Sequence, residues 1–217
     1  TETAYFCRMD ADDIAFPERL ARQTAFLDAH PDIDLVASSI VFFRNDGTLF
    51  GVASPPARHE AICRTPWQGF HLFHPTWMGR TAWFRAHPYR SDADGVEDQV
   101  LLYGAFRESR FAGIPEVLLG YREDRRSFRR VFRRRRLFWR KIAAQACRSG
   151  RWGDACRLSL IQPAKIAADF LNMRLGVARL RTRLDPVDPA LAAAWRAISP
   201  GAAATPVPPD GSKSDGP

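Results

Sequence analysis

The chain has 217 residues, 46% of them hydrophobic, which is normal for a globular protein and leaves room for one domain plus an extension. Its formal net charge of +8 is unevenly distributed. Residues 1–120 carry 11 arginines against 16 acidic residues, whereas residues 121–217 carry 21 basic against 8 acidic residues. The acidic first part suits a metal site, and the basic second part suits an anionic partner such as a membrane surface or a phosphate-bearing lipid.

The four cysteines are widely spaced and form no C-x-x-C pair, so neither a zinc site nor a disulfide framework is expected. Free thiols in a reducing cytoplasm are the prediction. No segment approaches the roughly 20 consecutive apolar residues that a membrane-spanning helix needs. The chain begins with Thr1 rather than Met, and its first residues have the pattern of a strand, so we expect a fragment that lacks its true N-terminus. No signal peptide is visible, and a missing N-terminus would hide one.

The first half of the chain alternates apolar segments with turn-forming residues. Pro17 suits the first turn of a helix, and Pro31 ends that helix because the residue before a proline avoids the helical region. Asn45-Asp46-Gly47 predicts a hairpin turn. The predicted elements are, in chain order, a strand at 4–9, a helix at 17–29, a buried strand at 35–43, a hairpin strand at 48–52, a short helix from 59, helices at 81–86 and 99–107, and an edge strand at 111–119 that contains Pro115.

Three carboxylates, those of Asp10, Asp12 and Asp13, follow the first predicted strand. Asp10 and Asp12 are two residues apart, so on an extended backbone they point to the same face. Two hard oxygen ligands with open coordination positions suit Mg²⁺ or Mn²⁺ bridging the phosphates of a nucleotide, and Asp13 is a second candidate for the direct ligand. The structural alternative is an acidic, solvated helix N-terminus, where the helix dipole favours carboxylates.

Two blocks of residues, in a fixed order over roughly residues 1–125, resemble family 2 glycosyltransferases of the GT-A fold. The first block consists of Asp10-Ala11-Asp12-Asp13, Pro17-Glu18-Arg19-Leu20, Gln23, Phe26-Leu27 and His30-Pro31-Asp32-Ile33-Asp34-Leu35-Val36. The second consists of Glu97-Asp98, Val100-Leu101-Leu102, Ile114-Pro115-Glu116 and Tyr121-Arg122. The two blocks together are more specific than either acidic cluster alone.

The resemblance implies an α/β fold in which residues 1–122 form the later half of a GT-A domain, a Rossmann-like nucleotide-diphospho-sugar transferase fold. Residues 123–198 would be a basic helical extension, and residues 199–217, rich in Gly, Ala, Pro and Ser, a disordered tail. The implied activity is the inverting transfer of a sugar from a nucleotide-sugar donor, commonly a UDP-sugar in this family. The implied acceptor is a saccharide or a lipid-linked saccharide in the synthesis of a surface polysaccharide or glycolipid.

The resemblance also implies roles for the acidic residues. Asp98 would be the general base, and Glu97 would orient the acceptor or the base. The structural alternative for both is again a helix N-terminus that favours carboxylates. Asp10 and Asp12 would hold a divalent cation, Mg²⁺ or Mn²⁺, one directly and the other through water or the donor ribose. The donor would be bound by all three carboxylates of the acidic segment, including Asp13.

A His-Pro step at 74–75, followed by Met78 and a basic residue, fits the same family pattern. The resemblance implies that His74 and Arg80 lie beside the donor phosphates or the acceptor. For His74, a packed histidine bonded to the backbone is the structural alternative.

Ten arginines lie between residues 122 and 140, with aromatic residues interleaved. The pattern favours a basic amphipathic helix at an anionic membrane surface, or a helix packed on the catalytic domain with arginine stems covering apolar surface. Nucleic acid is a less favoured partner. The predicted localisation is therefore cytoplasmic, with a peripheral contact at the inner face of the membrane. Further helices are predicted at 141–162, from Pro163 to 184, and at 188–198.

Two alternatives to sugar transfer remain at this point. Haloacid dehalogenase-type phosphatases also place Asp-x-Asp after a strand, but they require a Thr or Val two residues later, where this chain has Ile14. The second alternative is a non-enzymatic module whose arginine-rich region binds an anionic membrane or nucleic acid. A steep fall of affinity with salt would be the mark of such a module.

Overall fold

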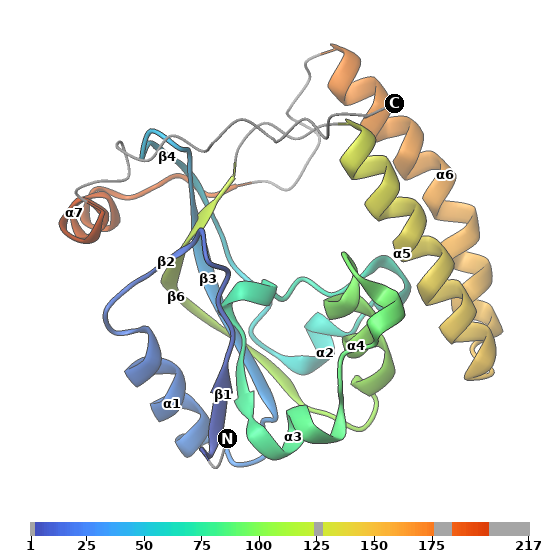
Figure 1. Cartoon of the computed structure of the whole chain (residues 1–217), viewed down its shortest axis with the longest axis horizontal. Coiled ribbons are helices and arrows are strands. Elements are labelled where there is room, and N and C mark those ends of the chain that lie inside the picture. Colours follow the sequence, from blue (N-terminus) through green and yellow to red (C-terminus); the bar gives the residue numbers. More distant parts are fainter. Residues whose placement is uncertain (1–2, 124–127, 176–183, 200–217) are drawn as a thin grey trace, which may run out of the picture.

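The computed structural model describes residues 3–123, 128–175 and 184–199 of the chain. A twisted sheet has helices on both faces, and a hairpin of two long helices stands beside it (Figure 1). The strands are β1 Tyr5–Cys7, β2 Ile14–Ala15, β3 Leu35–Phe43, β4 Leu49–Ala53, β5 Met78–Arg80 and β6 Phe111–Arg122. The α-helices are α1 Arg19–Ala29, α2 His59–Ile62, α3 Thr81–Ala86, α4 Glu97–Ala105, α5 Phe128–Arg148, α6 Trp152–Leu175 and α7 Pro189–Ile198. The described chain is thus of the mixed α/β class that the sequence predicts.

β3 is the central strand, and all nine of its residues are buried. It pairs in parallel with β6, and its other edge pairs with β5 at one end and β4 at the other. Leu35 and Ala37 belong to the apolar cluster that contains α4, whereas Val36 belongs to the cluster that contains Leu27 of α1. A run rich in Val, Ile and Phe is typical of a strand covered on both faces. The strand predicted at 35–43 is confirmed with the same bounds, as is the helix at 81–86.

α1 begins two residues later than predicted and ends, as expected, before His30-Pro31. The predicted apolar stripe is wrong at Leu20, which is 59% exposed. The side chains that α1 buries are Arg19, Gln23 and Leu27, spaced four residues apart and therefore on one face of the helix. The inward face of α1 is consequently polar over its first two turns. Its side chains can therefore form hydrogen bonds with the neighbouring segments of the chain.

β6 is three residues longer than the strand predicted there, and it lies between β3 and β2 rather than at an edge of the sheet. The edge prediction rested on Pro115, which cannot donate to a strand ladder. The register with β3 shifts at this point, because Ser38 pairs with Ile114 and Ser39 pairs with Val117. The Ser39 hydroxyl donates to the Pro115 carbonyl at 2.8 Å. A bulge therefore accommodates the proline inside the sheet.

α5 and α6 form a hairpin that turns at Ser149-Gly150, with Gly150 at a φ of 68°, so the residues predicted to be helical at 141–162 are divided between the two helices. The prediction that a new helix starts at Pro163 is wrong, because α6 continues through this proline. A proline inside a helix costs about 3 kcal/mol through its missing N–H and a clash with the preceding turn. Contacts with α5 and the core hold α6 on both sides of it: Leu158 is buried before it, and Asp169 is paired with Arg135 of α5 at 2.7 Å after it.

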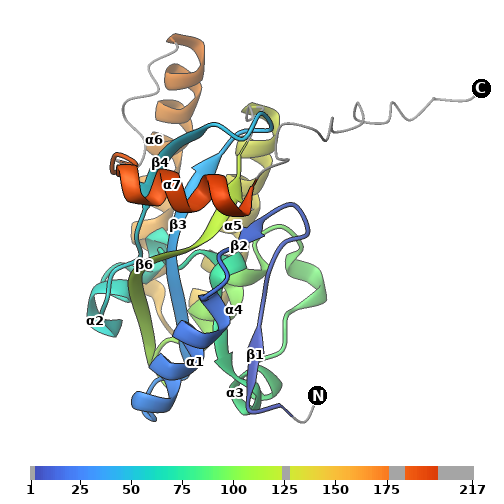
Figure 2. The same cartoon turned by 90° about the vertical axis from the view of Figure 1, so that its left-hand side faces the viewer.

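α7 returns to the sheet and lies across the end that carries β4, β3 and β6 (Figures 1 and 2). Asp188 caps it by accepting a hydrogen bond from the Leu191 N–H at 2.7 Å, so the helix predicted at 188–198 is confirmed. Trp195 of α7 is 3% exposed and packs on the ring of Phe43 at 4.8 Å between centroids. One indole on α7 therefore packs deep against the central strand.

The Trp195 ring packs where Gly120 of β6 has no side chain. A Cβ at residue 120 would lie 2.2 Å from the Trp195 ring. We expect Gly120→Ala to lower the free energy of unfolding by about 1–3 kcal/mol, because the indole must move or the strand must bend. Urea denaturation measures this. Gly153→Ala in α6 is the matched control, because a Cβ there has no atom within 4 Å. Equal stability of the two variants would contradict this packing.

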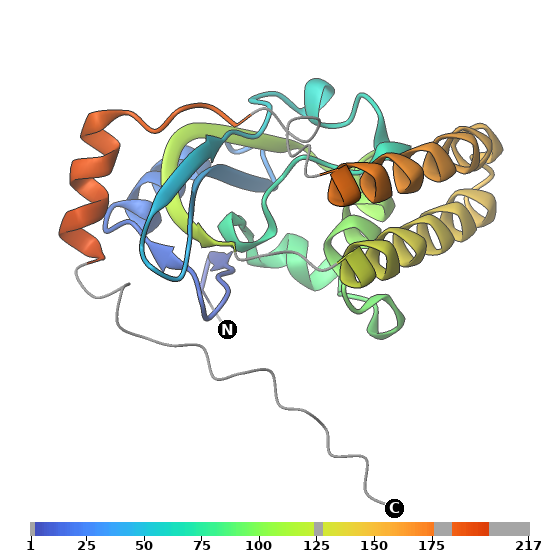
Figure 3. The ribbon, with the colours of Figure 1, turned by 90° about the horizontal axis from the view of Figure 1, so that it is seen from above.

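No helix in the described ranges is long and apolar enough to cross a lipid bilayer. The disordered tail predicted at 199–217 lies outside the described residues except for Ser199. The view from above shows the sheet with α7 on one side of it and the α5–α6 hairpin on the other (Figure 3).

Candidate functional site

A cleft of about 1420 Å³ lies between the sheet and the α5–α6 hairpin. Its walls come from the segment after β1, from β3 and β4, from residues 70–75, from the N-terminal end of α4 and from α5. Four of the predicted site residues line it: Asp10, His74, Glu97 and Asp98. The other three, Asp12, Asp13 and Arg80, are outside its lining.

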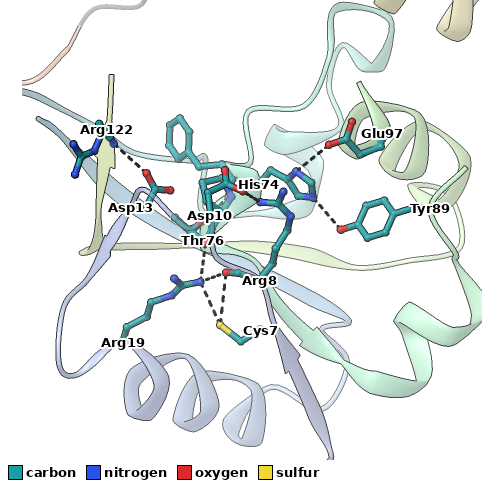
Figure 4. A network of polar contacts seen from close by, with 12 residues as sticks. Cys7, Arg8, Asp10, Asp13, Arg19, His74, Thr76, Tyr89, Glu97 and Arg122 are labelled. Atoms are coloured by element: carbon teal, nitrogen blue, oxygen red, sulfur yellow. Dashed lines mark hydrogen bonds and ion pairs between the residues drawn. The ribbon is translucent and has the colours of Figure 1, made fainter. Parts of the chain in front are cut away.

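Asp10 enters the cleft from the segment that follows β1 (Figure 4). Its carboxylate forms an ion pair with Arg8 at 2.7 Å, and both side chains are half-buried. The expectation of an extended backbone through Asp12 is wrong, because β1 ends at Cys7. Residues 10–13 form a turn, in which the Asp13 N–H donates to the Asp10 carbonyl at 3.3 Å. Asp12 is exposed on that turn. The structure thus brings Asp10, but not Asp12, to the cleft.

Asp13 is buried beneath the same turn, at 6% exposure. Its Oδ1 accepts a hydrogen bond from the Arg122 N–H at 3.0 Å, and its Oδ2 has no partner among the described residues. Burial raises the pKa of Asp13 to about 7, and the carboxylates of Asp12 and Asp10 add to this rise. The Arg122 side chain donates to the Asp12 carbonyl at 3.0 Å. Asp13 and Arg122 therefore hold the acidic turn against β6.

His74 lies between Tyr89 and Glu97, of which Glu97 lines the cleft (Figure 4). Its Nε2 is 2.9 Å from the Tyr89 hydroxyl, and its Nδ1 is 3.9 Å from Glu97 Oε1. Burial is the main cause that lowers the pKa of His74 to about 4, and the Arg8 guanidinium lowers it further. Burial raises the pKa of Tyr89 to about 12. Near neutral pH, His74 is therefore an uncharged imidazole.

Asp98 and Glu97 occupy the first turn of α4. Asp98 is 5% exposed, and its Oδ2 accepts a hydrogen bond from Gln99 Nε2 at 2.9 Å. The Gln99 side chain also accepts from the Phe70 N–H at 2.7 Å, so it ties Asp98 to the neighbouring wall of the cleft. Glu97 Oε2 is buried and has no hydrogen-bond partner among the described residues. The structure places both predicted catalytic carboxylates in the cleft.

Arg80, unlike Asp98 and Glu97, lies outside the lining of the cleft. Its guanidinium donates to the carbonyl oxygens of Leu27 at 2.9 Å, His30 at 3.2 Å and Ile33 at 3.1 Å. These carbonyls lie at and just after the C-terminus of α1, where a cation is favoured by the helix dipole. The contacts of Arg80 are thus those of a residue that fixes the end of α1.

Arg19 and Gln23 belong to the first block that resembles glycosyltransferases, but their role in supporting the site was not predicted. Arg19 is 2% exposed, and its NH2 donates to the carbonyls of Arg8 at 2.5 Å and Pro75 at 2.8 Å. Gln23 donates to the Thr76 carbonyl at 2.7 Å and accepts from Arg19 Nε at 3.0 Å. These bonds connect the segment that carries Asp10 to the segment that carries His74. The available signal was polar residues four apart on a helix face that also carries Leu27.

The α5 wall of the cleft was also missed. The sequence suggested a membrane-facing helix or a helix packed on the domain, and α5 packs against α4 and α6. Five of its arginines line the cleft: Arg129, Arg133, Arg134, Arg136 and Arg140. The cleft thus has a basic side on α5 and an acidic side around Asp10 and the start of α4.

The low pKa of His74 predicts acid sensitivity. A histidine has a pKa of about 6.5 when unfolded, so the unfolded chain binds a proton here at a higher pH than the folded chain does. The stabilising effect is present above pH 6.5 and is lost as the pH falls towards 4. The charges facing His74 are Arg8 and Arg134, which disfavour protonation, and Glu97 and Asp10, which favour it.

We therefore expect the free energy of unfolding to fall between pH 7 and pH 4 by about 2–3 kcal/mol more in the wild type than in His74→Gln. Urea denaturation of both proteins at several pH values gives the two slopes. Parallel slopes would show that His74 does not titrate in this window.

The acidic residues of the cleft can be compared with the ligands that a divalent cation requires. No group of three or more His, Cys, Asp or Glu side chains within the described residues could hold a metal ion. Mg²⁺ is usually bound by one or two carboxylates, with waters and substrate phosphates as the remaining ligands. Asp10, a hard oxygen donor at the cleft, fits that type of site. Any such ion would take most of its ligands from the substrate and from water.

The chain was compared with protein families and with known proteins. No family model matches the chain. The chain is 32% identical over 131 residues to the protein named "Putative glycosyltransferase EpsE" of Bacillus subtilis (strain 168). The match covers 58% of this chain and 46% of that protein, so the chain spans about half the length of its relative. This likeness supports a relationship to glycosyltransferases.

Proposed function

We propose that this chain carries the catalytic cleft of a family 2, GT-A-type glycosyltransferase, which transfers a sugar from a nucleotide-sugar donor to a saccharide or lipid-linked acceptor. The observation that carries the proposal is the convergence on one cleft of Asp10, His74 and the adjacent pair Glu97-Asp98, three sites that are far apart in sequence. The likeness to a glycosyltransferase supports the same reaction class. The process that it would serve is the synthesis of a surface polysaccharide or glycolipid.

Asp98 is proposed as the general base. A hydroxyl of the acceptor would lose its proton to the Asp98 carboxylate while its oxygen forms a bond to the anomeric carbon of the donor sugar. The bond from that carbon to the diphosphate oxygen breaks in the same step, and the nucleoside diphosphate leaves. The hydrogen bond from Gln99 to Asp98 Oδ2 fixes the orientation of the carboxylate and leaves Oδ1 for the acceptor.

Glu97 and neutral His74 are proposed to position the acceptor. Glu97 Oε2 has no partner within the described part of the chain, and it lies in the same helical turn as Asp98. A buried carboxylate oxygen without a partner is costly, and an acceptor hydroxyl would satisfy it. His74 Nδ1 is 3.9 Å from the other oxygen of Glu97, so the two side chains lie side by side where the acceptor would bind.

Asp10 is the residue that would hold Mg²⁺ or Mn²⁺. When bound, such an ion neutralises the charge that develops on the leaving diphosphate. Arg8, which pairs with Asp10 at 2.7 Å, keeps the carboxylate in place at the cleft. Asp12 and Asp13 remain proposals as donor contacts, the first through its exposed position on the same turn.

The reaction is tested by measuring the release of nucleoside diphosphate from a panel of nucleotide-sugars by the full-length protein, with saccharide and lipid-linked acceptors. The panel is run with Mn²⁺, with Mg²⁺ and with a chelator. We expect acceptor-dependent release with at least one donor, strongest in the presence of a divalent ion. A protein that binds Mn²⁺ but releases nothing from any donor would contradict the proposal.

A further inference from the structure

Four arginines of α5 form a continuous basic face. Arg129, Arg133, Arg136 and Arg140 are spaced four, three and four residues apart, which places them on one side of a helix. All four line the cleft. The row spans about 16 Å at the rise of an α-helix, so it follows a whole wall of the cleft rather than one corner. This set is called the arginine face below.

The arginine face differs from Arg135 and Lys141, two cations of α5 that have fixed partners. Arg135 is paired with Asp169 at 2.7 Å, and Lys141 is paired with Asp92 at 2.9 Å. No ion pair joins any member of the arginine face to a carboxylate in the described residues. Like charges at these helical spacings repel one another. The chain therefore carries a row of cations that destabilises its own helix and borders a cleft.

The chemistry of the row favours phosphate. A guanidinium presents a planar fork of donors that matches phosphate oxygens in pairs, and such charge-assisted bonds are about twice as strong as neutral ones. Glu97 and Asp98 also line the cleft, and their carboxylates disfavour a ligand that is negative throughout. The fitting ligand is one with a compact anionic group at one end and neutral hydroxyl groups at the other.

We propose that the arginine face binds the diphosphate group of a substrate of this cleft. The inference rests on the proposed function only for the identity of the molecule that carries this group. Two sources share the chemistry: the nucleoside diphosphate part of the donor and the diphosphate of a lipid-linked acceptor. In either case the diphosphate lies along α5, and the sugar part points towards Asp98 and Glu97.

A double variant, Arg133→Gln with Arg136→Gln, removes two charges from the centre of the arginine face. Its matched control is Arg22→Gln with Arg148→Gln, which removes two charges from exposed positions that do not line the cleft. The probe is inorganic pyrophosphate, titrated calorimetrically into the full-length protein. We expect the affinity to fall by about 10²-fold in the first variant, since two charge-assisted contacts are lost, and to stay unchanged in the control.

Equal affinities of the two variants, or no binding of pyrophosphate by the wild type, would overturn the proposal. It would also fail if the arginine-face variant lost binding only to vesicles of phosphatidylcholine and phosphatidylglycerol and kept its affinity for pyrophosphate. That result would assign α5 to a membrane surface. Circular dichroism and a urea unfolding curve establish that both variants are folded.

Two further titrations identify the source of the diphosphate. A selective loss of UDP affinity in the arginine-face variant assigns the face to the donor, and a selective loss of farnesyl diphosphate affinity assigns it to the acceptor. Both results support a diphosphate site. These titrations measure binding without turnover. If the chain binds pyrophosphate through α5 but transfers no sugar, the diphosphate site is supported and the proposed function is contradicted.

Discussion

Replacing Asp98 by asparagine should lower kcat for sugar transfer by about 10²- to 10⁴-fold, the usual contribution of a general base, while the affinity for the donor changes little. Asparagine keeps the shape of the side chain and can still accept the hydrogen bond from Gln99, but it cannot take the acceptor proton. Asp98 lies in the first turn of α4, so the loss of its charge should cost stability by only about 0.3–1 kcal/mol. Steady-state kinetics and donor titration of the full-length protein separate the two effects.

The control for this experiment is Asp32→Asn, an exposed aspartate outside the cleft. It should keep the kcat of the wild type. Full activity of Asp98→Asn would reject the assignment of the base. An equal fall of kcat in both variants would indicate a general effect on folding instead.

Replacing Arg19 by methionine should lower the free energy of unfolding by about 3–5 kcal/mol. Methionine fills a similar volume, but it leaves the carbonyls of Arg8 and Pro75 and the side-chain oxygen of Gln23 without their donor. Each buried acceptor without a partner costs about 1–3 kcal/mol. Relief of the cost of burying a cation offsets part of this loss. Urea denaturation at neutral pH gives the difference.

Arg22→Met is the matched control, because Arg22 lies on the same helix and is exposed. Its effect should stay within about 0.5 kcal/mol. Arg19→Lys should restore only part of the stability, since a lysine lacks the planar fork that reaches several acceptors at once. If both methionine variants had the same stability, the role of Arg19 in joining the Arg8 and Pro75 segments would be refuted.

Much of the fold was predictable because its local signals agree with its tertiary packing. The run at 35–43 is apolar, rich in branched residues and bounded by turn formers, and it became the buried central strand. Asn45-Asp46-Gly47 produced the hairpin between β3 and β4, with Gly47 at a φ of 79°. His30-Pro31 ended α1 where the steric rule for prolines placed the end.

The errors share a physical origin in tertiary contacts that override a local rule. Pro115 and Pro163 read as an edge strand and a helix start, but a bulge accommodates the first and packing against α5 carries α6 past the second. The spacing of Asp10 and Asp12 assumed an extended backbone, whereas the segment turns as soon as β1 ends. Sequence spacing cannot reveal which of two carboxylates a turn will direct into a cleft.

The candidate site was predicted in part. Of the seven residues selected by the resemblance to glycosyltransferases, Asp10, His74 and the adjacent pair Glu97-Asp98 line the cleft, whereas Asp12, Asp13 and Arg80 do not. The arginine face was visible as a charged run, but whether such a run faces solvent, membrane or a cleft depends on how α5 packs. The structure answers this through the placement of α5 between α4 and α6.

The most direct test of the central claim is hydrogen–deuterium exchange of the full-length protein with and without a nucleotide-sugar and Mn²⁺. If the cleft is the donor site, exchange should slow in peptides that cover residues 8–13, 70–77 and 97–100, and should stay unchanged in α7. Slower exchange confined to segments away from the cleft, with these three segments unaffected, would contradict the account.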